Sequence, residues 1–208
     1  MGLETLPSRV MTEGVHVKTM HIGFNQLSSL DDLKDMTQLV TLKAAQNRIS
    51  SVPSFIGTMS NLEVLDLTGN QISSLPKEFY SLNKLKRLHL SYNRLSVIDA
   101  ALSSLHSLEE LTLACNEIQS LPNEVFKHMN KLILLDLSQN NLTQLPSSIQ
   151  SLVSLEELYI SCNQLAHLPT EVYQLKSMRS LDVSNNSIEV LPEGLLNLVK
   201  LQELIAQV

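Results

Sequence analysis

The sequence predicts an α/β solenoid, in which each turn of the chain adds one strand to a single parallel sheet. Asparagine recurs along the 208 residues with successive gaps of 22, 23, 23, 23, 24, 23 and 23 residues. Apolar residues precede each of these asparagines by eight, five and three positions and follow it by two. Six of the seven prolines stand six residues after such an asparagine, and Pro7 marks the same phase before the first. The landmark asparagines are Asn25, Asn47, Asn70, Asn93, Asn116, Asn140, Asn163 and Asn186.

The segment before each landmark asparagine has the apolar spacing of a short strand with one buried face. Leu62, Leu65 and Leu67, which precede Asn70, are one example. Because no single repeat can bury its own core, successive strands must stack in parallel, about 4.8 Å apart.

The landmark asparagines are predicted to be structural. Such a side chain can turn inward at the end of a strand and bind backbone groups that would otherwise be buried without a partner. Proline six residues later suits an irregular return on the convex side, where no sheet donor is needed. Asp31 and Asp99 take this place in the two repeats without proline. The stretch after Pro122, residues 123–129, is expected to form a short helix or a 3-10 turn.

The pattern Leu-x-x-Leu-x-Leu-x-x-Asn-x-Leu resembles that of the leucine-rich repeat family over nearly the whole chain. This resemblance implies a leucine-rich repeat solenoid, a right-handed superhelix with a concave parallel β-sheet and convex loops that carry short helical or 3-10 turns. The return segment Leu-Pro-x-x-(Ile/Val)-x-x-Leu is similar to that of the intracellular Ras group, which includes Shoc-like scaffolds and the Ras suppressor. We expect one domain over residues 1–208, with eight repeats of about 23 residues and a partial repeat at each end.

Neither end of the chain shows the polar cap that a solenoid needs, so the sequence is expected to be a fragment of a longer protein. The ninth repeat begins with Leu201 and Leu204 and stops before its asparagine. With Leu195 and Leu198, these leucines are predicted to have an incompletely covered side. Such a surface would favour weak end-to-end self-association.

Charge and composition argue against two classes of partner. The net charge is −6, and lysine and arginine are scattered apart from Lys84, Lys86 and Arg87, whereas nucleic acids and anionic membranes require larger clusters of basic residues. No stretch approaches 18 consecutive apolar residues, so no membrane span is expected.

The two cysteines are expected to be free thiols. Cys115 and Cys162 lie two repeats apart, about 10 Å by the strand spacing, which is too far for a disulfide. Secreted members of the resembled family usually carry cysteine clusters at their ends, and the chain starts without a basic or apolar signal segment. Together these features favour a cytoplasmic protein.

No set of residues suggests catalysis, so the chain is not expected to be an enzyme or to bind a cofactor or metal. Phosphate-binding glycine loops, Cys-x-x-Cys, His-Glu-x-x-His and Gly-x-Ser-x-Gly motifs are all missing. His21 and His89, the histidines at outward strand positions, are about 14 Å apart and cannot share a metal ion. Both cysteines are interpreted as small polar fillers at the exit edge of a strand.

If the apolar strand positions point inward, the positions six, four and two before each asparagine point outward on the concave face. The last of these columns is uniformly small and would form a shallow floor. With the flanking column, the first four repeats carry a balance of +2, from Lys18, Lys43, Lys86 and Arg87 against Glu63 and Asp66. The next four repeats carry −5, from Glu109, Glu110, Asp136, Glu156, Glu157 and Asp182 against Arg179.

Leu134 and Tyr159 are outward-facing and surrounded by these carboxylates, as in an interface core with a polar rim. The residues expected to bind a partner are Arg87, His89, Glu110, Leu134, Asp136, Glu157, Tyr159 and Asp182. The same residues could instead form an ordinary solvated face with cross-strand charge pairs.

We expect a protein-interaction module or scaffold, which the Ras-group resemblance connects to small-GTPase or phosphatase signalling. Its partner would be a protein with a basic and partly apolar surface. Two alternatives are the recognition segment of a larger kinase, GTPase or receptor, and an extracellular recognition protein.

Overall fold

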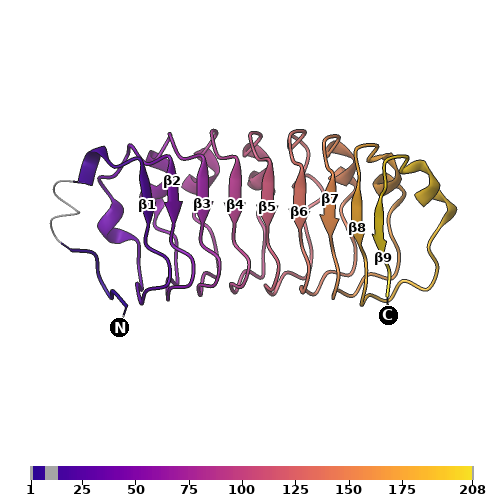
Figure 1. The fold of residues 1–208 in the computed structure, drawn as a ribbon, viewed down its shortest axis with the longest axis horizontal. Coiled ribbons are helices and arrows are strands. Elements are labelled where there is room, and N and C mark those ends of the chain that lie inside the picture. Colours follow the sequence, from indigo (N-terminus) through magenta and orange to yellow (C-terminus); the bar gives the residue numbers. More distant parts are fainter. Residues whose placement is uncertain (1, 8–13, 208) are drawn as a thin grey trace.

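A computed structural model describes residues 2–7 and 14–207, which form one elongated stack of coils (Figure 1). Nine parallel strands lie side by side in chain order along its length. They are β1 Thr19–His21, β2 Thr41–Lys43, β3 Val64–Asp66, β4 Arg87–His89, β5 Glu110–Thr112, β6 Leu134–Asp136, β7 Glu157–Tyr159, β8 Ser180–Asp182 and β9 Glu203–Ile205. This sheet confirms the predicted solenoid.

The return segments form 3-10 helices on the side away from the sheet. These are η1 Gly14–His16, η2 Asp31–Leu33, η3 Ser54–Thr58, η4 Lys77–Ser81, η5 Ala100–Ser104, η6 Ser147–Ser151, η7 Thr170–Gln174 and η8 Glu193–Asn197. Pro53, Pro76, Pro146, Pro169 and Pro192 each stand directly before such a helix, in an extended conformation. Asp99 replaces proline before η5, and its side chain accepts a hydrogen bond from the backbone N–H of Ala101 at 2.8 Å.

The segment between β5 and β6 differs from this pattern. Residues 123–128 form hydrogen-bonded turns instead of a continuous 3-10 helix, so of the two expected forms the 3-10 turn is the one present. The backbone N–H of Val125 binds the carbonyl of Pro122, and that of Lys127 binds the carbonyl of Glu124. This repeat is one residue longer than its neighbours, and both Val125 and Phe126 are fully buried. The extra residue is therefore accommodated within this return segment without loss of its buried contacts.

The core is continuous and mostly aliphatic. In the repeat that contains β5, the inward residues Leu108, Leu111 and Leu113 are at most 1% exposed. Phe79 and Phe126 fill the convex side and are completely buried. Because each inward side chain packs on the same positions of the two neighbouring coils, stacking buries what one repeat alone would leave exposed.

The asparagine ladder is present as predicted. The side-chain amide of Asn116 donates to the carbonyl oxygens of Leu90 and Leu113, both at 3.0 Å, and its Oδ1 accepts the backbone N–H of Leu95 at 2.9 Å. Asn47, Asn70, Asn93, Asn140 and Asn163 repeat this geometry. Over residues 2–7 and 14–207, no buried side-chain nitrogen or oxygen lacks a hydrogen-bond partner.

The last repeat is only partly covered. Leu204 is 41% exposed, and Leu195 and Leu201 are half-buried, as expected. Leu198 is only 4% exposed, so the expectation was wrong for this residue. It follows η8 directly, and its backbone N–H binds the carbonyl of Leu195, which turns its side chain into the core.

Candidate functional site

The strand register places the predicted binding residues on one outward face of the sheet, here called the concave face. Each strand contributes its first and third residues to this face, and its middle residue is turned inward. The first-residue column runs through Arg87, Glu110, Leu134, Glu157 and Ser180 on successive strands. The third-residue column runs through His89, Thr112, Asp136, Tyr159 and Asp182. All eight predicted residues are thus brought together over β4–β8.

Two pairs of these residues contact each other. The hydroxyl of Tyr159 donates to Glu157 Oε2 at 2.8 Å, and His89 Nε2 lies 3.3 Å from Glu110 Oε2. Burial, followed by the hydrogen bond to Glu157, raises the pKa of Tyr159 above its usual value. The hydroxyl of Tyr159 thus links the third-residue column to Glu157 of the first-residue column.

The aspartates of the third-residue column have a structural role that the sequence analysis missed. Oδ1 of Asp66, Asp136 and Asp182 accepts the backbone N–H two residues later, at 2.9–3.0 Å. This local turn explains why aspartate recurs where a strand ends. Asp136 and Asp182 are consequently fixed in orientation.

Ion pairs on the flanking column neutralise part of the charge. Lys86 Nζ lies 2.8 Å from Glu63 Oε2, and Arg179 Nε lies 2.9 Å from Glu156 Oε2. The bond to Lys86 lowers the pKa of Glu63, and the same bond raises the pKa of Lys86. The repeats that contain β5–β8 carry six outward carboxylates and one arginine, Arg179, which pairs with Glu156. The other five carboxylates remain, so the net charge of this part of the concave face is −5.

A row of left-handed residues follows the strands and was also missed by the sequence analysis. The residue before each landmark asparagine has a φ between 51° and 68°. This conformation turns the asparagine inward and directs the preceding side chain to the surface, at the exit edge of the sheet. Phe24 and Tyr92 occupy two of these positions, with 84% and 59% of their side chains exposed. In the sequence, the sign that could have indicated these two exposed residues is their position directly before a landmark asparagine.

Both cysteines belong to this left-handed row and are free, as predicted. Cys162 is exposed and Cys115 is partly exposed, and both lie at the exit edge of the sheet, as expected. The neighbouring thiol of Cys115 is the main cause of the raised pKa of Tyr92, and Asp136 contributes through its charge. Tyr92 thus extends the predicted patch towards the exit edge of the sheet.

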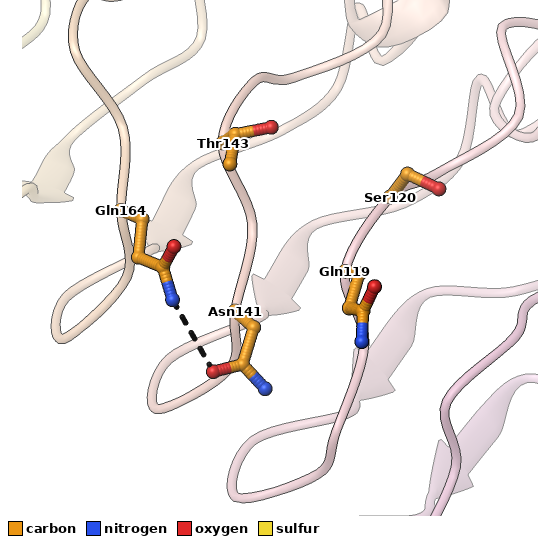
Figure 2. Close-up of a pocket in the computed structure, with 5 residues that line it drawn as sticks. All are labelled: Gln119, Ser120, Asn141, Thr143 and Gln164. Atoms are coloured by element: carbon orange, nitrogen blue, oxygen red, sulfur yellow. Dashed lines mark hydrogen bonds between the residues drawn. The ribbon is translucent and has the colours of Figure 1, made fainter.

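A second surface feature lies on the loops that follow the landmark asparagines (Figure 2). Gln119, Ser120, Asn141, Thr143 and Gln164 line an open cavity of about 580 Å³. Nε2 of Gln164 donates to Asn141 Oδ1 at 3.4 Å. All five side chains are uncharged, so this cavity offers hydrogen bonds but no ionisable group that could act as an acid or base or activate the hydroxyls of Ser120 and Thr143.

The part of the chain that the structure describes has neither a metal-binding cluster nor a membrane-spanning helix. No three His, Cys, Asp or Glu side chains there are grouped so that they could hold a metal ion. No helix in the same part is long and apolar enough to cross a membrane.

The family model with the description "Leucine rich repeat" matches residues 45–95, 60–114, 106–165 and 153–207. These matches together span the strands from β3 to β9. The chain belongs to the leucine-rich repeat family. A comparison with curated protein sequences gave no match.

Several solved leucine-rich repeat structures are similar to this chain. A leucine-rich repeat protein of Leptospira interrogans is 33% identical, with a TM-score of 0.92, over 99% of this chain and 52% of its own. The plant peptide hormone receptor RGFR1, solved in complex with RGF2, is 28% identical with a TM-score of 0.85, over 97% of this chain and 33% of its own.

The repeat ectodomain of an Arabidopsis thaliana membrane receptor kinase, GASSHO1/SCHENGEN3, was solved in complex with CASPARIAN STRIP INTEGRITY FACTOR 2. It is 26% identical with a TM-score of 0.84, over 97% of this chain and 28% of its own. This leucine-rich repeat chain therefore spans about half of the bacterial protein and about a third of each plant receptor.

Proposed function

We propose that this leucine-rich repeat chain is a protein-interaction module that binds its partner on the concave face of β4–β8. The observation that carries the proposal is the position of Leu134 and Tyr159 on adjacent strands, close to the carboxylates of Glu110, Asp136, Glu157 and Asp182. Within residues 2–7 and 14–207, none of these four carboxylates forms an ion pair with a lysine or arginine. Apolar contact area with a charged rim is the usual composition of a protein interface. The partner would therefore be basic and partly apolar.

The similar plant receptors, which were solved with bound partners, add support for a binding function. They also favour a second candidate, in which the chain is the recognition segment of a larger receptor or enzyme. The matched regions make up only a third or less of those receptors.

We further propose that the repeats are of the Ras-group type and act in a reducing cytoplasmic compartment, in small-GTPase or phosphatase signalling. The Leu-Pro-x-x-(Ile/Val)-x-x-Leu return segments and the two unpaired thiols support this assignment. The ectodomain among the similar structures favours the extracellular alternative.

Weak end-to-end self-association is proposed for the last repeat, where Leu196 and Val199 are 84% and 78% exposed. Sedimentation velocity over a hundredfold range of protein concentration should show a shift towards dimer that Leu196→Ser with Val199→Ser removes. A sedimentation coefficient that stays constant for the unchanged chain would contradict this.

The binding proposal is tested by selecting a display library of random peptides on the purified chain. Enriched peptides should combine Lys or Arg with apolar residues, because the −5 balance surrounds Leu134 and Tyr159. They should not be retained by Asp136→Lys with Glu157→Lys. They should be retained by a control with the same change in charge, Glu117→Lys with Glu189→Lys, whose side chains are exposed outside the concave face. Enrichment without a basic bias, or equal retention by both variants, would overturn the proposal.

A further inference from the structure

An open cavity lies at the opposite end of the concave face from the acidic patch. Its volume is about 260 Å³, and it is lined by His21, Gly23, Phe24, Lys43, Ala45 and Asp66 from the first three coils. Pockets that hold drug-sized ligands measure about 300–1,000 Å³. This cavity is therefore of a size for one side chain of a partner and not for a whole small molecule.

The cavity exists because its floor is made of the smallest residues of the chain. Gly23 and Ala45 lie two residues before their landmark asparagines. A Cβ on Gly23 would come within 3.0 Å of the carbonyl oxygen of Ala45. Phe24 forms one wall from its left-handed position, with 84% of its side chain exposed. The free protein thus leaves a large aromatic ring in solvent beside an empty space.

The charge around this cavity is opposite to that over β5–β8. Lys86 and Glu63 pair with each other, which leaves Lys18, Lys43 and Arg87 against Asp66 over β1–β4, a balance of +2. The side chains of Lys43 and Arg87 are exposed. One oxygen of Asp66 is already bound to the backbone N–H of Thr68 at 3.0 Å. The concave face is therefore basic at its first coils and acidic at its later ones.

The two ends have a fixed separation. The cavity is centred on β2, and Asp136 and Tyr159 lie on β6 and β7. Four to five strand spacings of about 4.8 Å give roughly 20–24 Å, which an extended peptide covers with about seven residues at 3.3 Å each. Between the two ends the floor is formed by small residues, including Ser91 and Ala114, both buried. A peptide backbone can approach such a floor closely.

We propose that the partner binds this face as an extended peptide whose order of charges is opposite to that of the face, acidic over the first coils and basic over the later ones. An apolar side chain next to a carboxylate occupies the Phe24 cavity beside Lys43, and basic side chains about seven residues away lie over Asp136 and Glu157. This inference rests on the proposed function and specifies the partner's charge order and length. The uneven charge, together with the cavity, gives the bound peptide one orientation along the solenoid.

The test uses three synthetic peptides and the isotope-labelled chain in NMR titrations. The first peptide carries Trp-Glu at one end and Arg-Leu-Arg at the other, with a flexible spacer of about five residues. The second has the same ends joined without the spacer, and the third keeps only the basic end. Versions of the first peptide with a nitroxide at either end report, through line broadening, which strands each end approaches.

The nitroxide at the Trp-Glu end should broaden the amide signals of β1–β3. The nitroxide at the basic end should broaden the amide signals of β6–β8. The first peptide should bind about tenfold more tightly than the other two, equivalent to about 1.4 kcal/mol. Ala45→Leu, which fills the cavity, should remove that tenfold gain and leave the basic-only peptide unaffected. A circular dichroism spectrum equal to that of the unchanged chain is the check that this variant is folded.

Equal broadening by both labels, or a gain that survives Ala45→Leu, would overturn the inference. The proposed function would still stand if the basic-only peptide bound over β5–β8. If no peptide perturbed the concave face at about 1 mM, both the inference and the proposed function would fail.

Discussion

Asn116→Ala is expected to lower the free energy of unfolding by about 3 kcal/mol, because it removes hydrogen bonds that buried backbone groups cannot replace. Asn116 Oδ1 is the acceptor for the buried N–H of Leu95, at 2.9 Å. The carbonyls of Leu90 and Leu113 each lose one of two asparagine donors, because Asn93 binds the first and Asn140 the second. The largest part of the loss therefore comes from the N–H of Leu95.

Urea unfolding followed by circular dichroism measures this loss. Asn141→Ala is the control, because Asn141 is exposed and its side-chain oxygen accepts a long hydrogen bond, from Gln164 at 3.4 Å. Its effect should stay within about 0.5 kcal/mol. If Asn116→Ala unfolded at the same urea concentration as the unchanged chain, the ladder would not be what satisfies the buried backbone.

Phe126→Ala is expected to cost about 4 kcal/mol, within the range for large-to-small changes in a core. Phe126 is fully buried on the convex side, in the return segment between β5 and β6, which has no 3-10 helix. Its backbone N–H also binds Ser148 Oγ of the next coil, at 3.3 Å. Removing the ring should leave a cavity between these two coils, because the extra residue holds the segment at its present length.

Thermal unfolding of Phe126→Ala should be compared with that of Val153→Ala. Val153 is 59% exposed on the convex side, so its truncation should change the stability by at most about 0.5 kcal/mol. Equal melting temperatures for the two variants would mean that Phe126 only fills space that the neighbouring coils can close.

The fold could be predicted from the sequence because the same few positions decide it in every repeat. The apolar period fixes which strand residues point inward, and the landmark asparagine fixes where each strand ends. Leu108, Leu111 and Leu113 are therefore buried as their spacing requires. The columns of the concave face follow from the same period, which is why all eight candidate residues fall on adjacent strands.

Features that depend on one repeat alone could not be predicted in this way. The extra residue in the return segment after Pro122 changes a local hydrogen-bond pattern without breaking the apolar period. The exposure of Phe24 and Tyr92 follows from a left-handed backbone that glycine or asparagine would adopt more easily. The hydrogen bond that the backbone N–H of Ser138 donates to Asp136 Oδ1 depends on the geometry of the turn, which the repeat pattern does not specify.

The Phe24 cavity illustrates the same limit. The sequence shows that the residues two positions before each landmark asparagine are small. It places the candidate binding site in the acidic repeats, because outward apolar residues and carboxylates occur together there. The cavity depends on Gly23, Phe24 and Ala45 together with side chains from three coils. Because this cavity lies at the basic end of the concave face, the two ends of the face differ, and a bound peptide would have one preferred orientation.

The affinity of the best selected peptide, measured by calorimetric titration, tests the concave-face proposal most directly. Titrations would use the unchanged chain, Asp136→Lys with Glu157→Lys, and the control Glu117→Lys with Glu189→Lys, each at low and high salt. The concave variant should weaken binding about a hundredfold or more, equivalent to about 2.7 kcal/mol. The control should stay within about threefold, and salt should weaken binding to the unchanged chain. Equal affinities for the two variants, or binding insensitive to salt, would show that the partner does not use this face.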